Sequence, residues 1–201
     1  LLASGHEVHA LTRPHSATRL PPGANAVIGD ALDAASFKER IPRGATFIHL
    51  VGTPHPSPVK AVEFRRVDLV SIQAAISAAL SAGVAHFVYV SVAHPAPVMQ
   101  AYIAVRSAGE ALLQAAGLPS TVLRPWSVLG PGHRWPYALV PLYALLRLNP
   151  ATRATALRLG LVTLEDMLRS LEAALLEPCA GGVRVVEVPA MLASRRSTRT
   201  R

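Results

Sequence analysis

Residues 85–124 read AHFVYVSVAHPAPVMQAYIAVRSAGEALLQAAGLPSTVLR, and this stretch decides the fold. Two apolar runs, 85–91 and 120–124, flank a segment whose apolar residues recur at helical spacing up to Gly117. The runs are apolar throughout instead of alternating with polar residues, which is typical of parallel strands buried on both faces. This strand–helix–strand order predicts a βαβ unit.

The same alternation continues on both sides of this unit. The predicted strands are 8–12, 26–29, 47–51, 85–91, 120–124 and 183–188, and the predicted helices are 59–82, 98–116 and 163–176. The last helix opens with TLED, which resembles a capping box. Strands that alternate with helices of this length predict an α/β fold with a doubly wound parallel sheet, Rossmann-like in kind. Residues 137–148 are predicted as a further helix, compatible with a lid, a small C-terminal subdomain, ordinary packing or a dimer face.

Composition limits the classes of function. The net charge of +8 could indicate a nucleic-acid-binding protein, but aromatic residues are only 5% and are not interleaved with the basic ones. We therefore expect no nucleic-acid partner, and predict a basic, disordered tail at 194–201. The single cysteine, Cys179, excludes an internal disulfide and fits a cytoplasmic protein. No apolar run is long enough to span a membrane, and no set of histidines has the spacing of a metal site.

The first five residues, Leu-Leu-Ala-Ser-Gly, have the pattern of a helix end capped by Gly5 and running into a strand. Such a helix normally follows a strand of its own and a glycine-rich turn that holds the phosphates of a dinucleotide. No G-x-G-x-x-G pattern occurs in the 201 residues. We therefore expect the first strand and its glycine-rich loop, about 20 to 25 residues, to lie upstream of Leu1.

Six pieces of the sequence, taken in order, resemble a known family. They are GHEVHALTR (5–13), VIGDALD (27–33), FIHLVGTP (47–54), FVYVSV (87–92), YIAVR (102–106) and VLRPWSVLGPGHRWP (122–136). Together they resemble the atypical members of the short-chain dehydrogenase/reductase superfamily, which are NmrA-like or like the NAD-dependent epimerases. The resemblance implies one NAD(P)-binding Rossmann-like domain over 1–193, with small substrate-side elements in about 125–193.

Candidate cofactor residues follow the predicted strands. Arg13 ends the first strand, where an arginine can pair with the 2′-phosphate of NADP; a solvated arginine is the alternative. NADP is therefore the expected cofactor, with NAD as the alternative. The resemblance places Asp30 and Ala31 beside the adenine, although Asp30 could equally cap a helix. It also implies that Val51, Gly52 and Thr53 line the cofactor, although they could form only a turn before Pro54.

Candidate catalytic residues lie on the next strand and helix. The resemblance implies that Ser91 orients a substrate carbonyl and that Tyr102 donates the proton, although Tyr102 could be an ordinary amphipathic-helix residue. The family has a lysine four residues after the tyrosine, and this chain has Arg106. An i, i+4 pair shares one helix face, so Arg106 could bind a ribose or stabilise a phenolate. A forked guanidinium does not replace an ammonium, however, which puts proton-relay catalysis in doubt.

Candidate substrate residues follow the fifth predicted strand. Pro125 is expected near the cofactor, and Trp126, His133 and Trp135 are expected at the substrate, although a loop histidine is more often solvated. The leading hypothesis is an NAD(P)-binding oxidoreductase or epimerase-like protein that acts on a small carbonyl or hydroxyl compound. The alternative is a redox-inactive NADP-binding structural or sensor protein. A homo-oligomer is compatible with either hypothesis.

Overall fold

The computed structural model describes residues 1–130, 138 and 140–197, the last four by their backbone only. The strands are β1 Val8–Thr12, β2 Ala24–Ile28, β3 Thr46–His49, β4 His86–Val90, β5 Ser120–Arg124, β6 Ser127–Leu129, β7 Leu161–Thr163 and β8 Val183–Glu187. The α-helices are α1 Ala61–Glu63, α2 Val70–Ala82, α3 Gln100–Ala116, α4 Val140–Leu148, α5 Pro150–Arg158, α6 Leu164–Leu176 and α7 Val188–Ser197. Short 3₁₀ turns lie at Leu2–Ser4, Pro14–Arg19, Ala34–Ser36, Lys38–Arg40 and Pro58–Lys60, and a π-helical turn at Phe64–Leu69.

All strand pairs among the described residues are parallel, as the uninterrupted apolar runs predict. The central sheet has the order β3-β4-β5-β8, while β1 pairs with β2 and β6 pairs with β7 in two smaller sheets. The predicted Rossmann-like α/β architecture is confirmed. Within the described residues β1 and β3 do not hydrogen-bond to each other, so the β1–β2 pair forms a sheet of its own.

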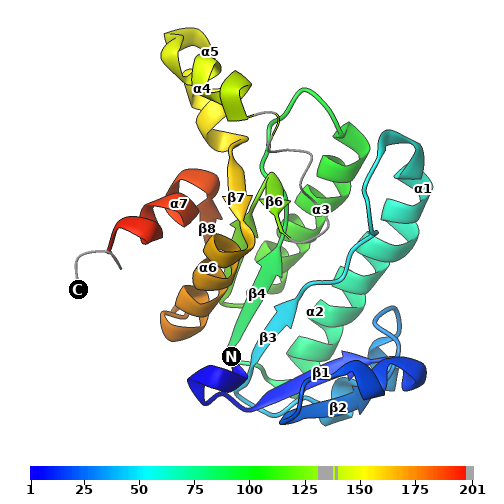
Figure 1. Ribbon diagram of the computed structural model, residues 1–201. Helices are drawn as coiled ribbons and strands as arrows, with labels where there is room; N and C mark the ends of the chain where they lie inside the picture. The colour runs from blue at the N-terminus through cyan, green and yellow to red at the C-terminus, as the bar shows by residue number, and fades with distance from the viewer. Residues whose placement is uncertain (131–137, 139, 198–201) are drawn as a thin grey trace.

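Helices cover both faces of the central sheet (Figure 1). Alternate residues of β4 point to opposite faces, so Phe87 and Tyr89 pack with α2 and α3, whereas Val88 packs with α6 and α7. The two apolar clusters formed in this way bury the sheet between two helical layers. The carboxyl ends of the strands lie along one edge, where open α/β sheets bind their ligands.

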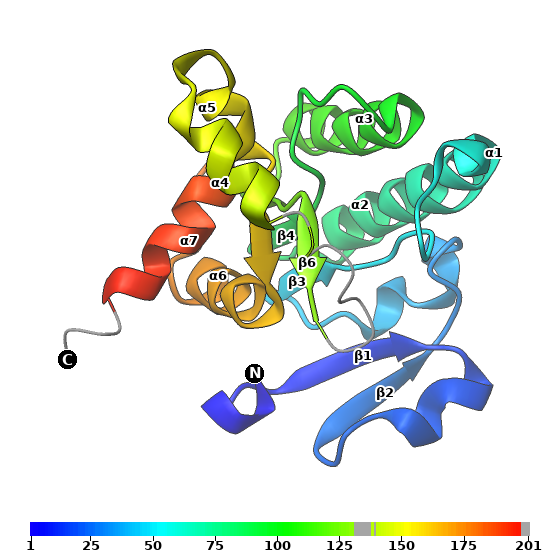
Figure 2. The same ribbon diagram turned by 45° about the horizontal axis from the view of Figure 1, so that its top comes forward.

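The β1–β2 pair sits apart from the central sheet (Figure 2). It contacts the rest of the protein through a small apolar cluster in which Val27 and Phe37 pack on Ala78 of α2. A second attachment lies at the chain start, where Ser4 Oγ donates to Glu172 Oε1 of α6 over 2.6 Å. Gly5 ends the first helical turn in the left-handed conformation at φ 81°, so the glycine cap predicted there is confirmed.

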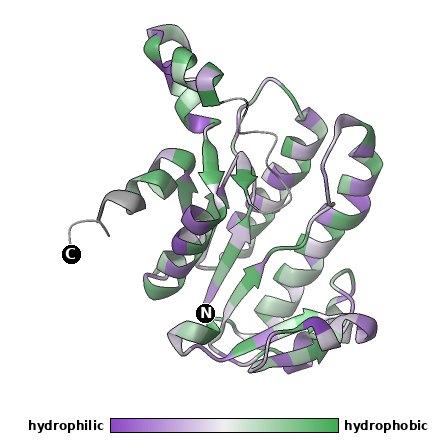
Figure 3. Ribbon diagram, in the orientation of Figure 1, coloured by the Kyte–Doolittle hydropathy of each residue, from purple (hydrophilic) through white to green (hydrophobic). Residues whose placement is uncertain are grey.

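Two helices of the structure differ from their predicted bounds. The helix predicted over 59–82 is divided into a 3₁₀ turn, α1, the π-helical turn and α2, and only its end before Gly83 is as expected. Of the helix predicted over 137–148, α4 forms Val140–Leu148. Its leucines Leu142, Leu145 and Leu148 are exposed, and the hydrophobic residues of the ribbon are green in Figure 3. The backbone of α7 continues to Ser197, into the predicted tail.

Within the described part of the chain, no helix combines the length and the hydrophobicity needed to cross a bilayer. Nor do the described residues bring together three or more His, Cys, Asp or Glu side chains that could hold a metal ion.

Candidate functional site

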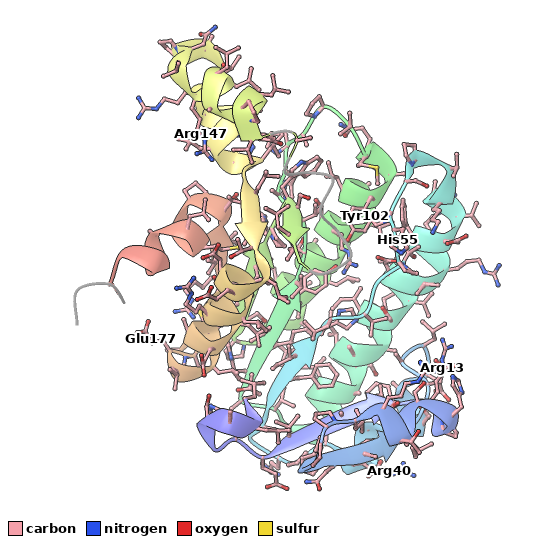
Figure 4. All side chains as sticks on the ribbon, in the orientation of Figure 1. Arg13, Arg40, His55, Tyr102, Arg147 and Glu177 are labelled. Atoms are coloured by element: carbon pink, nitrogen blue, oxygen red, sulfur yellow. The ribbon has the colours of Figure 1, made fainter. Side chains whose placement is uncertain are left out.

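The carboxyl ends of β1 and β2 carry the residues predicted to meet the adenosine end of a dinucleotide. Arg13 directly follows β1 and is exposed, beside the β1–β2 pair (Figure 4). Asp30 is exposed two residues after β2, and its Oδ1 accepts a hydrogen bond from Leu32 N at 2.9 Å. Ala31, the next residue in the chain after Asp30, is half-buried. An arginine and a carboxylate are therefore both accessible at this edge.

The loop after β3 is fixed by hydrogen bonds to the buried carboxylate of Asp68. Asp68 lies in the π-helical turn and is fully buried. Its Oδ2 accepts hydrogen bonds from Thr53 N at 3.0 Å and Thr53 Oγ1 at 2.6 Å. The chain segment predicted to line the cofactor, Val51–Gly52–Thr53, is thereby fixed to the helix that follows it.

Arg106 joins the same network from α3. Its Nη2 lies 2.7 Å from Asp68 Oδ1, and its Nη1 donates to the carbonyl oxygens of Val90 at 3.1 Å and Val51 at 3.3 Å. The residue is only 5% exposed. A Cβ on Gly52 would overlap Arg106 Nη2, so the glycine makes room for the guanidinium. Arg106 therefore connects the ends of β3 and β4 from inside the protein.

Tyr102, one helical turn before Arg106, is half-buried. Its ring packs against Phe64 with centroids 5.0 Å apart, and Arg106 Cζ lies 5.1 Å from its centroid, at cation–π distance. Figure 4 shows Tyr102 on α3, far along the molecule from Arg13. The ring of Tyr102 is thus held between one aromatic neighbour, Phe64, and one cationic neighbour, Arg106.

Ser91 faces a charged cluster instead of Tyr102. Its Oγ donates to Glu110 Oε1 over 2.5 Å, and Arg124 pairs with both Glu110 and Glu187. His94 Nε2 lies 3.6 Å from the same Glu110 oxygen. Glu110 of α3 therefore contacts Ser91 and Arg124, at the ends of β4 and β5, and Arg124 extends the cluster to Glu187 at the end of β8.

One face of α3 organises both networks. Tyr102, Arg106 and Glu110 follow one another at four-residue spacing, which places them on the same side of the helix. Gly109 lets this helix lie close to β4, because a Cβ there would stand 2.7 Å from the hydroxyl oxygen of the buried Tyr89.

Two buried titratable groups lie near Arg106. Burial, together with the positive charge of Arg106, lowers the pKa of His49 from 6.5 to about 3, so that this imidazole is neutral. Burial also raises the pKa of Tyr89 to about 12 against the opposing charge of Arg106. Two neutral titratable groups therefore lie near the ion pair of Arg106 and Asp68.

The predicted substrate residues are only partly described. Pro125 is buried, and its carbonyl oxygen accepts from Ala93 N at 2.9 Å. Trp126 is half-buried and packs against the cluster that covers one face of the sheet. His133 and Trp135 lie outside the described residues.

The family model described as NAD(P)H-binding matches residues 1–137. This chain belongs to the NAD(P)H-binding family. The match confirms the predicted resemblance to NAD(P)-binding proteins of the short-chain dehydrogenase/reductase type. No curated protein matches the chain.

Solved structures share the fold of this NAD(P)H-binding protein. A nucleoside-diphosphate-sugar epimerase from Staphylococcus aureus has 17% identity and a TM-score of 0.61, over 89% of this chain and 61% of that one. A dTDP-glucose 4,6-dehydratase from Streptomyces venezuelae, solved with NAD, has 20% identity and a TM-score of 0.65, over 97% and 73%. A Thermus thermophilus UDP-glucose 4-epimerase in complex with NAD has 18% identity and a TM-score of 0.63, over 98% and 76%. The chain thus spans less than two thirds of the staphylococcal protein.

The residues of this NAD(P)H-binding protein fit one end of the dinucleotide better than the rest. Arg13 and Asp30 are exposed at strand ends, as an adenosine phosphate and an adenosine would require. Arg106 has its terminal nitrogens directed at Asp68 and two carbonyls, so a ribose would have to displace one of these partners. The glycine-rich pattern that receives a pyrophosphate does not occur among the 201 residues.

Sequence reasoning missed the two carboxylates that organise this site. Asp68 lies within the helix predicted over 59–82, and Glu110 follows Arg106 by four residues. The second spacing was a usable signal, because it continues the face of Tyr102 and Arg106. Asp68 gave no comparable signal, since its partners Thr53 and Arg106 are 15 and 38 residues away in the chain.

Proposed function

We propose that this chain binds NADP in preference to NAD and acts as an oxidoreductase or epimerase-like enzyme on a small carbonyl or hydroxyl compound. The observation that carries the cofactor choice is the exposed guanidinium of Arg13 at the carboxyl end of β1. There it can form charge-assisted hydrogen bonds to a 2′-phosphate, whereas an acidic residue would bind the 2′-hydroxyl of NAD.

The experiment compares the affinities for NADPH and NADH in the chain and in Arg13→Asp, by calorimetry up to millimolar concentrations. We expect the NADPH preference to fall at least tenfold, since removing a charge-assisted contact costs about 1.5 to 3 kcal/mol. Arg153→Asp on α5, another exposed arginine, makes the same charge change and should leave the preference unchanged. An unaltered preference in Arg13→Asp would disprove the assignment.

For the chemical step, we propose Tyr102 as the proton donor. When bound, the cofactor would supply or accept the hydride. The packing of Tyr102 between Phe64 and Arg106 supports a fixed position for its hydroxyl. The proposed role of Ser91 requires its hydroxyl to leave Glu110 when substrate binds.

The activity test uses NADPH with aldehydes and ketones, and NADP⁺ with UDP-glucose, the last because similar folds include sugar-nucleotide epimerases. Absorbance loss follows reduction of the carbonyl compounds, and chromatography follows conversion of UDP-glucose. Tyr102→Phe keeps the ring contacts and removes the hydroxyl, so it should abolish turnover while the unfolding temperature changes little. Full turnover in this variant would rule out Tyr102 as the donor.

A second function, a redox-inactive NADP-binding structural or sensor protein, is favoured by one specific observation. The guanidinium of Arg106 is buried and ion-paired with Asp68, at the position where the family that the sequence resembles has a ribose-binding lysine. NADPH binding without turnover of any compound in the panel would support this function over the enzyme.

A further inference from the structure

Helices α4 and α5 form a hairpin at one end of the molecule, and both views show it standing out from the central sheet (Figure 1, Figure 2). We call residues 140–158 the α4–α5 hairpin. The hydroxyl of Thr152 on α5 donates to the carbonyl oxygen of Leu146 on α4 over 2.6 Å. Arg158 Nε donates to the carbonyl oxygen of Pro95, in the loop after β4, at 3.1 Å. These contacts fix the two helices to each other and to the body of the protein.

The outer side of α4 is apolar. On its inner side, the half-buried Tyr143 packs against the apolar cluster that covers one face of the central sheet. Four aliphatic side chains lie outward and are 48%, 49%, 64% and 79% exposed, in the order Val140, Leu142, Leu145 and Leu148. We call these four residues the apolar stripe. A helix of a globular protein normally turns its apolar residues toward the core, so the exposed stripe indicates a surface that binds something.

The charged residues of the α4–α5 hairpin are all positive. They are Arg147, Arg153 and Arg158, and the sequence has no acidic residue between Glu110 and Glu165. Arg147 and Arg153 are exposed, and Figure 4 labels Arg147 on the hairpin. Among the described residues, no carboxylate forms an ion pair with any of these three arginines. The apolar stripe is therefore accompanied by positive charge that the protein itself does not neutralise.

Helix α6 also exposes leucines, but with the opposite charge beside them. Leu168 is 56% exposed, and Glu165 and Glu172 lie three residues before it and four residues after it, on the same helix face. An anionic surface would attract the α4–α5 hairpin and repel this face of α6. The two helices thus provide a comparison of similar exposed leucines in different electrostatic surroundings.

We propose that the α4–α5 hairpin binds to the surface of an anionic lipid bilayer. The apolar stripe enters the boundary between the headgroups and the acyl chains, and α4 lies in the plane of the interface. The guanidinium groups of Arg147 and Arg153 bind the lipid phosphates, which accept charge-assisted hydrogen bonds. The net charge of +8 adds a long-range attraction to the same surface.

A second copy of the chain is the other occupant that could cover the apolar stripe. Two hairpins placed face to face would bring their arginines together, and like charges disfavour such a contact. An anionic bilayer covers the stripe and neutralises the arginines at the same time. The proposal is independent of the proposed function, because the hairpin contains neither Arg13 nor Tyr102.

The experiment measures the binding of the 201-residue chain to lipid vesicles by cosedimentation. One set of vesicles contains phosphatidylcholine with about 30% phosphatidylglycerol, and the other contains phosphatidylcholine alone. We expect the anionic vesicles to bind at least about tenfold more tightly. Their advantage should shrink as sodium chloride rises from about 0.1 M to about 1 M, because salt screens the charges.

Two pairs of substitutions test the apolar stripe. Leu145→Gln with Leu148→Gln removes half of it and should weaken binding to anionic vesicles about 30-fold or more, since these side chains no longer gain from leaving water. The matched pair Leu168→Gln with Leu176→Gln, at exposed positions of α6, should leave binding unchanged. All four side chains are exposed, so the unfolding temperatures of both variants should remain close to that of the parent chain.

Two further pairs test the charges. Arg147→Gln with Arg153→Gln should weaken binding to anionic vesicles about 20- to 30-fold and barely change binding to neutral ones. Arg65→Gln with Arg66→Gln makes the same change in net charge at exposed arginines of the π-helical turn, which follows α1 on the far side of the molecule from the hairpin (Figure 1). This pair should weaken binding less than about threefold, because salt screens charges that lie far from the bilayer.

Three results would overturn the proposal. One is the absence of binding to anionic vesicles at about millimolar lipid. Another is an equal loss of binding in the α4 and α6 leucine pairs, or in the two arginine pairs, because the attraction would then not be local to the hairpin. The third is a dimeric mass in solution that Leu145→Gln with Leu148→Gln converts to a monomeric one, since a second copy would then cover the stripe.

Discussion

Removing Asp68 should destabilise the protein through Arg106, the charge that it neutralises. Their side chains are 0% and 6% exposed and 2.7 Å apart. Removal of one member of a buried ion pair leaves an uncompensated charge and costs about 3 to 5 kcal/mol. In Asp68→Leu the N–H of Thr53 also loses its acceptor, so this variant should lie at the upper end. In Arg106→Met the carboxylate keeps both hydrogen bonds from Thr53, so the loss should be smaller.

The double variant, Asp68→Leu with Arg106→Met, removes both charges together. Its loss should be smaller than the sum of the two single losses by about 2 kcal/mol or more, because neither charge is left alone. Urea unfolding followed by circular dichroism measures all four proteins. With a slope of about 2 to 3 kcal/mol per molar, a loss of 4 kcal/mol lowers the midpoint by about 1.3 to 2 M.

An exposed ion pair provides the control for this cycle. Lys38 and Glu39 are 3.9 Å apart, with side chains 41% and 84% exposed, so Lys38→Met should cost less than about 1 kcal/mol. If the two single losses at Asp68 and Arg106 were equally small, or added exactly in the double variant, the buried pair would not be the link between β3, β4 and α3.

Three further changes have defined outcomes. Folded His49 is neutral with a pKa of about 3, whereas the unfolded residue takes up a proton below about pH 6.5. The free energy of unfolding should therefore fall by about 2 kcal/mol between pH 7.5 and pH 5. Urea unfolding of His49→Gln at both pH values should show a fall that is smaller by about this amount. Gly52→Ala should cost about 1 to 3 kcal/mol through displacement of Arg106, and an unchanged urea midpoint would contradict the overlap. Thr163→Ala should lose about 1 kcal/mol by thermal unfolding, since Thr163 caps α6 in a box with Asp166, whereas Thr163→Ser should lose little.

The strongest sequence signals were local ones. The bounds of β1 and β5 were predicted exactly, since each is a short apolar run bounded by turn residues. The capping box at Thr163 was also recognisable from the four residues TLED. Such features depend on neighbours along the chain, which a single sequence displays.

Other elements gave no usable pattern. Strands β6 and β7 have three residues each, too few to show a period, and α5 combines alanine with arginine without an apolar face. The break in the helix predicted at 59–82 coincides with the π-helical turn that carries Asp68. The predicted pair of Ser91 and Tyr102 stays a prediction; their observed partners, Glu110 and Phe64, come from tertiary packing that the motif did not contain.

Gly109 determines how closely α3 can approach β4, although it has no side chain to offer a ligand. Its missing Cβ sets how closely the axis of α3 approaches β4 over Tyr89. Tyr102, Arg106 and Glu110 are carried on that helix as one rigid row, so a single methyl group at position 109 would lift all three together. The depth of the whole row is therefore controlled by a residue that has no side chain of its own.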